Sequence, residues 1–366
     1  MPSFWSVNRS RAPSAASETG PPDTALPNNQ PRRSVPNILA PRGSFSVPAS
    51  PARGVSPGAR SPRASSEGPA ASFEPAQGHE GNVSSTQQQA LDKLTASLLA
   101  DGAIEKENAP SYQQTQLLRF LRARNFDADA ARTMYMKAQE WKRDMELDRL
   151  CAEFDFEERE DVAAGGWRMY FHKTDRLGRP IFIQDLSNLD SDRIFARTSP
   201  DRIVANFAVT LEKAVQKRYQ ACTDMQGHLV DDNYMVLNVS GLGLSSFWTM
   251  RNQLQHLLAI LDENFPELSG YVLIINAPYL FSTVWACIKS WLPLQTAEKI
   301  QICGGDYMAC IGAHVDLDNW PEHLGGRCQC GAPTANGTAG ASPLRACERS
   351  DAGPWNSPAS TKLSPA

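Results

Sequence analysis

A strongly apolar segment interrupted by proline, YVLIINAPYLFSTVWACIKSWLPLQTAEKI at residues 271–300, constrains this chain more than any other feature. It begins with a run typical of a buried strand, Val272 to Ile275, and continues as a segment too apolar for an ordinary surface helix. Pro293 breaks that segment, and Thr296 and Lys299 follow one helical turn apart. Hydrocarbon surface beside a hydroxyl and an ammonium group suits a ligand with an apolar body and an anionic head, such as a phospholipid.

Composition divides the 366 residues into four parts. Residues 1–85 are rich in Pro, Ser, Ala, Gly and Arg without apolar periodicity, which predicts a disordered tail. Residues 86–150 are predicted to form a small helical region and residues 151–327 an α/β domain, while residues 328–366 are predicted to be mostly irregular. The Arg- and Ser-rich start favours a regulatory tail, with an organellar transit peptide as the alternative.

From residue 167 onward, short apolar runs alternate with long amphipathic patterns. This alternation predicts parallel βαβ units and hence an α/β fold, whereas a glycine-bearing loop between the first two runs predicts a hairpin. Strands are expected at Trp167–His172, Pro180–Leu186, Tyr234–Val239, Tyr271–Ile275 and Ile300–Cys303, and the long helices at Asp201–Tyr219 and Ser246–Phe265.

The eight cysteines show no CxxC pair, so reduced thiols are expected. Cys328-Gln-Cys330 could form half of a metal site, but the sequence offers no matching ligand pair, and His172 stands at no metal-binding spacing. No metal site is therefore predicted.

Catalysis and nucleic-acid binding find no support in the sequence. Gly241-Leu-Gly243 follows a predicted strand but lacks the third glycine of a dinucleotide-binding turn. No nucleophile–base pair is visible, which predicts a protein that is not an enzyme and has no cofactor besides a bound lipid. The net charge of −4 argues against general nucleic-acid binding.

The apolar segment after residue 280 has two interpretations. Spacings of three and four residues are typical of a core-facing helix, whereas two tryptophans near Lys289 and a proline favour a lid that dips into a membrane interface. The segment is too interrupted for a membrane span. The residues concerned are Phe281, Val284, Trp285, Ile288, Trp291 and Leu292.

Four blocks of sequence carry a resemblance to a known family. They are LLRFLRARNFD (117–127), HKTDRLGRPIF (172–182), IINAPYLFSTVW (274–285) and DAGPW (351–355). They resemble the CRAL-TRIO lipid-transfer proteins, and among these the fungal-type secretory phosphatidylinositol/phosphatidylcholine transfer proteins. The resemblance implies a small helical N-terminal region before an α/β lipid cage, with a mixed or parallel sheet flanked by helices and a mobile gate helix carrying the six apolar residues named above.

The resemblance also implies a headgroup site for phosphatidylinositol, formed by Arg124, Asp175, Glu267, Thr296 and Lys299. Thr296 and Lys299 would hold the phosphodiester and Glu267 the inositol hydroxyls. A lysine buried alone would need an anion nearby. Surface ion pairs are the alternative interpretation of this set, and Arg124 could simply bridge the helical region to the cage.

The positions that match the family's choline site have diverged. Small hydroxyls and tyrosines are replaced by Asn233, Met235, Phe171 and Phe182, which leaves a more apolar pocket wall. This predicts that phosphatidylinositol binding persists while the counter-ligand differs from phosphatidylcholine.

The resulting expectation is a soluble, monomeric lipid-transfer protein of the cytoplasm. It would visit Golgi, endosomal or plasma membranes transiently and present phosphatidylinositol to a lipid kinase. A carrier of a neutral hydrophobe such as a tocopherol, retinoid or sterol is one alternative, disfavoured here because such a ligand gives a buried Lys299 no counter-charge. A lipid-tethered signalling scaffold is another.

Overall fold

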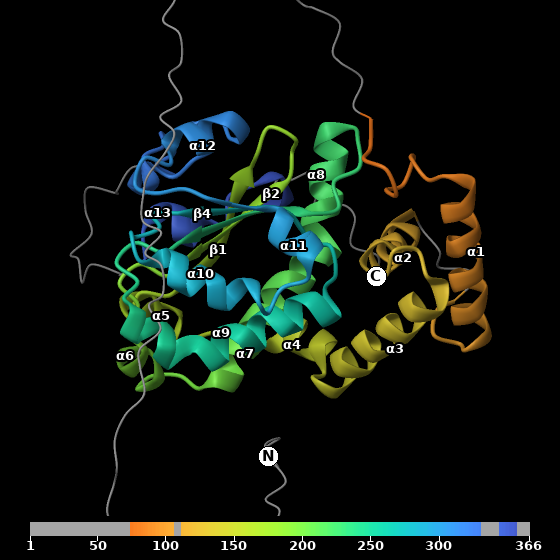
Figure 1. The fold of residues 1–366 in the computed structure, drawn as a ribbon, viewed down its shortest axis with the longest axis horizontal. Helices are drawn as coiled ribbons and strands as arrows, with labels where there is room; N and C mark the ends of the chain where they lie inside the picture. Colours follow the sequence, from red (N-terminus) through yellow and green to blue (C-terminus); the bar gives the residue numbers. More distant parts are fainter. Residues whose placement is uncertain (1–73, 106–110, 331–343, 357–366) are drawn as a thin grey trace, which may run out of the picture. The chain divides into compact units, whose positions relative to one another are not determined.

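The computed structural model describes residues 74–105, 111–330 and 344–356. Its N-terminal part is helical, as predicted, and Figure 1 shows α1 to α3 packed against one another. The helices are α1 (Ser85–Ala100), α2 (Ser111–Ala123), α3 (Ala128–Asp144), α4 (Leu147–Glu153) and α5 (Arg159–Ala164).

Local sequence explains where these helices begin and pack. Ser84 and Gln87 form a capping box at the start of α1, and the Asp127 carboxylate accepts from two backbone amides at the start of α3. Leucines at three- and four-residue spacing in α1 are buried against Leu117, Leu118 and other apolar residues, so this region has a small core of its own.

A five-stranded sheet follows, with the strand order β1-β2-β3-β4-β5. The hairpin of β1 and β2 is antiparallel and the remaining neighbours are parallel, which confirms the predicted mixed α/β sheet. The strands are β1 (Arg168–Thr174), β2 (Pro180–Asp185), β3 (Asn233–Asn238), β4 (Ser269–Ile275) and β5 (Ile300–Ile302).

Helices cover both faces of the sheet, so alternate strand residues are buried on opposite sides. Phe182, Met235 and Val272 belong to the core shared with α7, α9 and α10, whereas Tyr234 and Val236 face the opposite core with α12 and Trp320. Figure 1 shows α12 above the sheet and α9 and α10 below it. The helices are α6 (Ser191–Phe195), α7 (Pro200–Lys213), α8 (Tyr219–Gln226), α9 (Leu244–Asn264), α10 (Phe281–Lys289), α11 (Leu294–Glu298), α12 (Met308–His314) and α13 (Ala346–Ser350), with a π-helical turn at Ala214–Arg218 between α7 and α8.

The predicted disordered tail ends earlier than residue 85. Within residues 74–84, His79 Nδ1 lies 3.2 Å from an Asp231 carboxylate oxygen, and Gly78 accepts from Arg122 Nη1 at 3.2 Å. Composition alone could not predict these partly buried polar contacts, because their partners lie far along the chain. The prediction for residues 1–73 falls outside the described residues.

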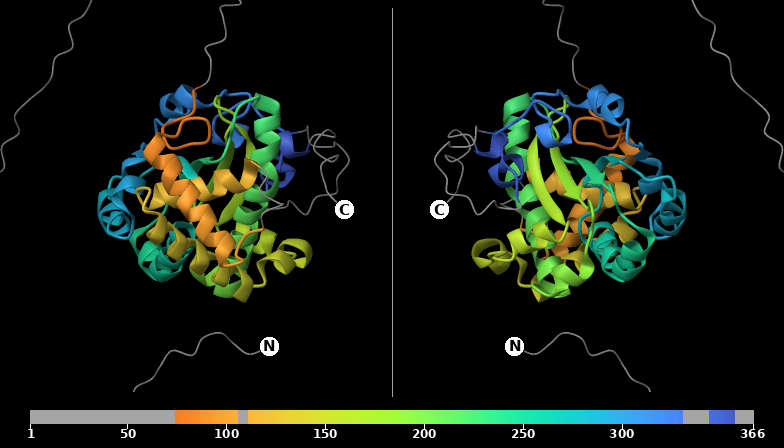
Figure 2. Two further views of the ribbon diagram at one scale, coloured as in Figure 1. Left: turned by 90° about the vertical axis from the view of Figure 1, so that its right-hand side faces the viewer. Right: turned by 90° about the vertical axis from the view of Figure 1, so that its left-hand side faces the viewer.

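The C-terminal segment also carries structure where irregular chain was predicted. Residues 344–356 contain α13 and a short 3-10 turn at Pro354–Asn356. Figure 2 shows dark-blue α13 beside the yellow-green hairpin, and Ala352 accepts a hydrogen bond of 2.5 Å from the Lys173 amide of edge strand β1. The segment thereby covers an edge strand whose backbone groups would otherwise be unpaired.

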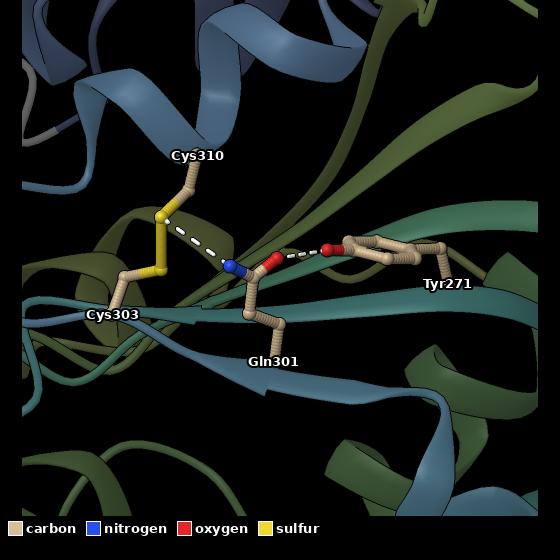
Figure 3. The surroundings of a disulfide bond; sticks show 4 residues. All are labelled: Tyr271, Gln301, Cys303 and Cys310. Carbon is tan, nitrogen blue, oxygen red and sulfur yellow. Dashed lines mark hydrogen bonds between the residues drawn. A yellow bond between two sulfur atoms is a disulfide. The ribbon is translucent and has the colours of Figure 1, made fainter. Parts of the chain in front are cut away.

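The expectation of eight reduced cysteines is wrong for two of them. Cys303, directly after β5, forms a disulfide with Cys310 of α12 (Figure 3). The turn after β5 brings α12 back over the strand, a proximity that the sequence spacing alone did not reveal. No helix among residues 74–105, 111–330 and 344–356 is long and apolar enough to cross a membrane.

Candidate functional site

An apolar cavity of about 160 Å³ lies between one face of the sheet and helices α9, α10 and α11. Met235, Val272 and Ile274 form its floor on the strands. Apolar side chains of α9 form a second wall, among them Phe247, Leu254, Leu257 and Leu261. A cavity with these walls suits hydrocarbon, because the hydrophobic effect favours apolar groups there over water.

The predicted gate segment forms α10, a short break and α11. Phe281, Trp285, Ile288, Trp291 and Leu292 line the cavity, and Val284 is buried in the neighbouring core. Trp291 stacks on Phe247 of α9, with the ring centroids 6.1 Å apart. The inward packing agrees with the core-facing interpretation, and insertion into a membrane stays a prediction.

Polar groups gather around α11. Lys299 Nζ donates a hydrogen bond of 2.7 Å to Glu267 Oε2, and Thr296 and Arg124 line the same cavity. Glu267 adopts a left-handed backbone conformation (φ 60°) directly after Phe265-Pro266. Lys299 is the C-cap residue of α11, and its carbonyl accepts from Val272 N at 3.1 Å, next to the start of the β4–β5 pairing. Four of the five predicted headgroup residues therefore line one cavity.

Lys299 has the nearby anion that a buried lysine requires, as its predicted grouping with Glu267 implied. Its side chain is 30% exposed, and the Glu267 carboxylate, 20% exposed, already neutralises it. A ligand phosphate is therefore not required to stabilise the ammonium charge, although it can compete with Glu267 for it. The earlier reason for disfavouring a neutral ligand no longer holds.

Asp175 lies away from the cavity. Its Oδ1 accepts from the Leu177 and Arg179 amides at 3.0 and 2.8 Å, and its Oδ2 forms an ion pair of 2.7 Å with the Arg179 guanidinium. This is an Asx-type turn in which Gly178 adopts φ 81°. Asp175 therefore shapes the β1–β2 loop and does not line the cavity with the other headgroup residues.

Only one of the four divergent choline-site positions lines the cavity. Met235 does so, and its sulfur accepts a hydrogen bond of 2.7 Å from Ser269 Oγ. Phe171 and Phe182 stack on each other with centroids 4.7 Å apart, and Arg218 lies 4.5 Å over the Phe171 ring. Asn233 is fully buried at the start of β3.

The cavity is also lined by polar residues that the sequence did not single out, namely Gln184, Asp262, Ser269 and Gln295. Burial raises the pKa of Asp262, and the positive charge of Arg124 opposes that rise. Asp262 stands four residues after Leu258 on the apolar face of α9, and an acid on such a face is a signal that sequence reading could have used.

A second polar cluster lies outside this cavity. The metal-ligating atoms of His172, Cys328, Cys330 and Cys347 all lie within 4.8 Å of one another. The sequence offered no ligand pair for Cys328 and Cys330 because the two partners lie on β1 and α13, separated from them in the chain but adjacent in the fold.

Comparison with known proteins agrees with this architecture. Residues 165–326 match the CRAL/TRIO domain model, and residues 89–142 match the model of the CRAL/TRIO N-terminal domain. A "Sec14 cytosolic factor" of Schizosaccharomyces pombe is 32% identical over 279 residues, covering 76% of this chain and 91% of that protein. The Arabidopsis thaliana "Phosphatidylinositol/phosphatidylcholine transfer protein SFH7" is 32% identical over 68% of this chain, which spans 43% of the plant protein.

The fold has a counterpart among solved structures. The crystal structure of Sfh5 superposes with a TM-score of 0.53 at 16% identity, covering 67% of this chain and 88% of that one. At this identity the likeness concerns the fold alone.

Proposed function

The chain belongs to the CRAL/TRIO family, and we propose that it is a lipid-transfer protein that binds phosphatidylinositol in the cavity behind α10 and α11. One observation carries the proposal: an apolar cavity has the cationic side chains Arg124 and Lys299 and the Thr296 hydroxyl among its lining residues. An anionic amphiphile needs an apolar wall for its hydrocarbon part and cationic or hydroxyl groups for its anionic head. The activity named for the Arabidopsis relative points the same way.

Lipid exchange in this scheme requires movement of the gate. The cavity of about 160 Å³ is smaller than the roughly 300–1,000 Å³ of typical small-molecule sites, and a phospholipid is larger than most such ligands. Each CH₂ group transferred from a bilayer to water costs about 0.8 kcal/mol, so a long acyl chain must pass directly from membrane to cavity. We therefore infer that α10 and α11 swing outward at the membrane surface.

Exposed apolar side chains flank the gate and provide a membrane contact. Tyr279 and Leu280, just before α10, are 97% and 56% exposed, and Leu294 at the start of α11 is 69% exposed. Insertion of these residues between lipid headgroups would remove apolar surface from water while the gate opens. This supports transient, peripheral membrane binding by a cytoplasmic protein.

In the bound state, the lipid phosphodiester would take a hydrogen bond from Thr296 and one from Lys299. Glu267 would then turn from the ammonium group toward the inositol hydroxyls, which are donors that a carboxylate accepts. Arg124 would add a second positive charge and is held between the cavity and the Ala123 carbonyl, to which Nη1 donates at 2.8 Å.

Mass spectrometry of the lipid bound to purified protein tests this assignment. Replacing Lys299 with alanine removes a charge-assisted hydrogen bond worth about 1.5–3 kcal/mol, so inositol lipid should fall by roughly 10- to 150-fold. Lys289→Ala is the matched control, because this exposed lysine of α10 does not line the cavity. Inositol lipid retained at the wild-type level in Lys299→Ala protein would refute the headgroup assignment.

The same measurement tests the counter-ligand. The apolar replacements near the former choline site support a second ligand other than phosphatidylcholine, and Met235 carries this argument because it lines the cavity. Abundant phosphatidylcholine in the purified protein would overturn this part of the proposal.

The Lys299–Glu267 pair favours a second candidate function, a carrier of a neutral hydrophobe. The pair leaves the cavity without an unbalanced charge at this position. A sterol-, retinoid- or tocopherol-like molecule as the predominant bound species, unaffected by Lys299→Ala, would select this function.

Transfer between vesicles separates both carriers from a lipid-tethered scaffold. A transfer protein moves labelled phosphatidylinositol from donor to acceptor vesicles catalytically, whereas a scaffold retains its lipid. We further propose that the carrier acts as a monomer and presents phosphatidylinositol to a lipid kinase. If so, adding the protein to a lipid kinase and labelled phosphatidylinositol should make phosphorylation of the lipid faster.

A further inference from the structure

We propose that His172, Cys328, Cys330 and Cys347 bind one Zn²⁺ ion in a tetrahedral site that fastens the C-terminal segment to the edge of the sheet. None of the four lines the lipid cavity, so this inference is independent of the proposed function. Three cysteines and one histidine form a closed donor set that leaves no position for water or substrate, which is typical of a structural zinc site.

The distances suit a single metal ion. Cys328 Sγ and Cys330 Sγ are 3.4 Å apart, Cys330 Sγ lies 3.9 Å from each His172 ring nitrogen, and all four ligand positions fall within 4.8 Å of one another. Zinc–sulfur and zinc–nitrogen bonds of about 2.3 and 2.0 Å place tetrahedral ligand atoms roughly 3.5–3.8 Å apart. Side-chain shifts of about 1 Å or less would therefore close the four ligands on the ion.

The fold brings these ligands together from three elements. His172 is fully buried on edge strand β1, on the opposite face from its neighbour Phe171. Cys328 is fixed by a bridge to Pro321, and its amide donates to Trp320 O at 3.0 Å. Cys347 lies in α13, where its thiol is 3.1 Å from the Cys328 carbonyl oxygen.

Backbone strain at Cys330 supports a ligand role. This residue adopts φ 46°, a left-handed conformation that side chains other than glycine and asparagine rarely take. The conformation keeps its sulfur within 3.9 Å of His172 and 3.4 Å of Cys328. Non-glycine residues persist in this region only where surrounding contacts enforce it, and a metal bond would supply such a contact.

The donor chemistry selects among metals. Thiolate and imidazole ligands favour zinc over magnesium and calcium, which prefer oxygen. A disulfide is the competing chemistry, but the three cysteines of the cluster are free thiols, and 3.4 Å between Cys328 and Cys330 exceeds the roughly 2.05 Å of a disulfide.

The metal would fix the position of the segment that follows α13 as well as that of the helix. Directly after this helix, Asp351 accepts from Arg218 Nη2 at 2.9 and 3.1 Å, and Trp355 meets Phe171 edge-on with centroids 6.2 Å apart. The segment thus passes from the His172 face of β1 around the strand edge to the Phe171 face. Zinc bound to the folded chain and not to the unfolded chain stabilises this arrangement by mass action.

The test uses the full chain purified without chelator. We expect one zinc per chain by elemental analysis, and cobalt-substituted protein should show thiolate charge-transfer bands and the intense visible absorption of tetrahedral Co²⁺. Cys330→Ser, at a half-buried position, should lower zinc content by at least tenfold, whereas Cys151→Ser, a free thiol outside the cluster, should retain one equivalent.

Circular dichroism shows whether the Cys330→Ser variant still folds. A variant with wild-type helicity and no zinc supports the proposal directly. Should that variant unfold, the cobalt spectrum of the wild-type protein decides by itself. Wild-type protein that binds neither zinc nor cobalt stoichiometrically, or peptide mass spectrometry that finds Cys328 and Cys330 joined as a disulfide in the native protein, would overturn the assignment.

Discussion

Asp231 connects three parts of the molecule, and its replacement gives the sharpest test of how the helical region is attached to the cage. Its carboxylate lies 3.1 Å from Arg122 Nη2 and 3.2 Å from His79 Nδ1, and its carbonyl accepts from Arg119 Nη1 at 3.3 Å. Arg119 and Arg122 belong to α2, His79 to the segment before α1, and Asp231 to the chain entering β3.

Asp231→Asn removes the negative charge while preserving the shape of the side chain. Arg122, only 9% exposed, would then be a buried cation without its carboxylate. Removing one partner of a buried pair costs about 3–5 kcal/mol. At about 2–4 °C per kcal/mol for a domain of this size, Tm should fall by roughly 6–20 °C.

Urea denaturation followed by far-UV circular dichroism measures this change. Asp129→Asn is the control, because Asp129 pairs with Lys93 at 2.6 Å but is 78% exposed, and such pairs contribute about 0–1 kcal/mol. A loss below about 1 kcal/mol for Asp231→Asn, no larger than for the control, would contradict the role assigned to this pair.

The pH dependence provides an independent check. Burial alone would raise the pKa of Asp231, but the hydrogen bond from His79 and the charges of Arg122 and Arg119 outweigh it and hold the pKa below its ordinary value of 3.8. A depressed folded-state pKa stabilises the protein above the unfolded value, and that contribution is lost as pH falls through the folded-state value. The difference between wild-type and Asp231→Asn stability should therefore be full at neutral pH and shrink below pH 3.8.

Three further predictions concern the gate and the core. Gln295→Ala removes the hydrogen bond of 3.0 Å between α11 and Asn125, worth about 0.5–1.5 kcal/mol, so lipid exchange between vesicles should accelerate roughly 2- to 13-fold in a fluorescence assay. Leu294→Asp should weaken binding to neutral vesicles in flotation, because an exposed apolar anchor is replaced by a charge; unchanged flotation would argue against this contact. Phe182→Ala, at a fully buried ring stacked on Phe171, should lower the free energy of unfolding by about 3–5 kcal/mol, measured in urea.

The strands and long helices could be predicted because their signals are local. Val272 to Ile275 is a continuous apolar run, and the strand is buried on both faces as such a run requires. Lys299, Thr296 and Glu267 could also be placed together, since the resemblance to a family supplied the long-range information that periodicity lacks. The need of a buried Lys299 for an anion already pointed to Glu267, whereas the exposure and geometry of the pair depend on the tertiary fold, including the backbone turn at Glu267.

Asp175 shows where transfer from a family pattern fails. Its neighbours in sequence match the family, but within this chain its carboxylate is used by the amides of its own turn and by Arg179. A short acidic side chain followed by glycine three positions later is a turn signal, and that local chemistry decided its role.

The partners of the cysteines could not be predicted for a different reason. Metal and disulfide partners are set by tertiary distance, and Cys303 meets Cys310 only because α12 returns over β5, while Cys330 meets His172 only across the sheet edge. Spacing in the sequence informs such pairs only when both partners lie on one local element.

The two faces of β1 would separate the proposed movement of the gate from the proposed metal site. Phe171 points into the core that continues to the gate, whereas His172 points toward Cys330 and α13. In the proposed function, α10 and α11 form the wall that yields, and the opposite wall must keep its shape while lipid enters and leaves. A metal site at the far edge of the sheet would supply that rigidity without touching the lipid, so loss of the ion should loosen the C-terminal segment while leaving the choice of headgroup to Lys299 and its neighbours.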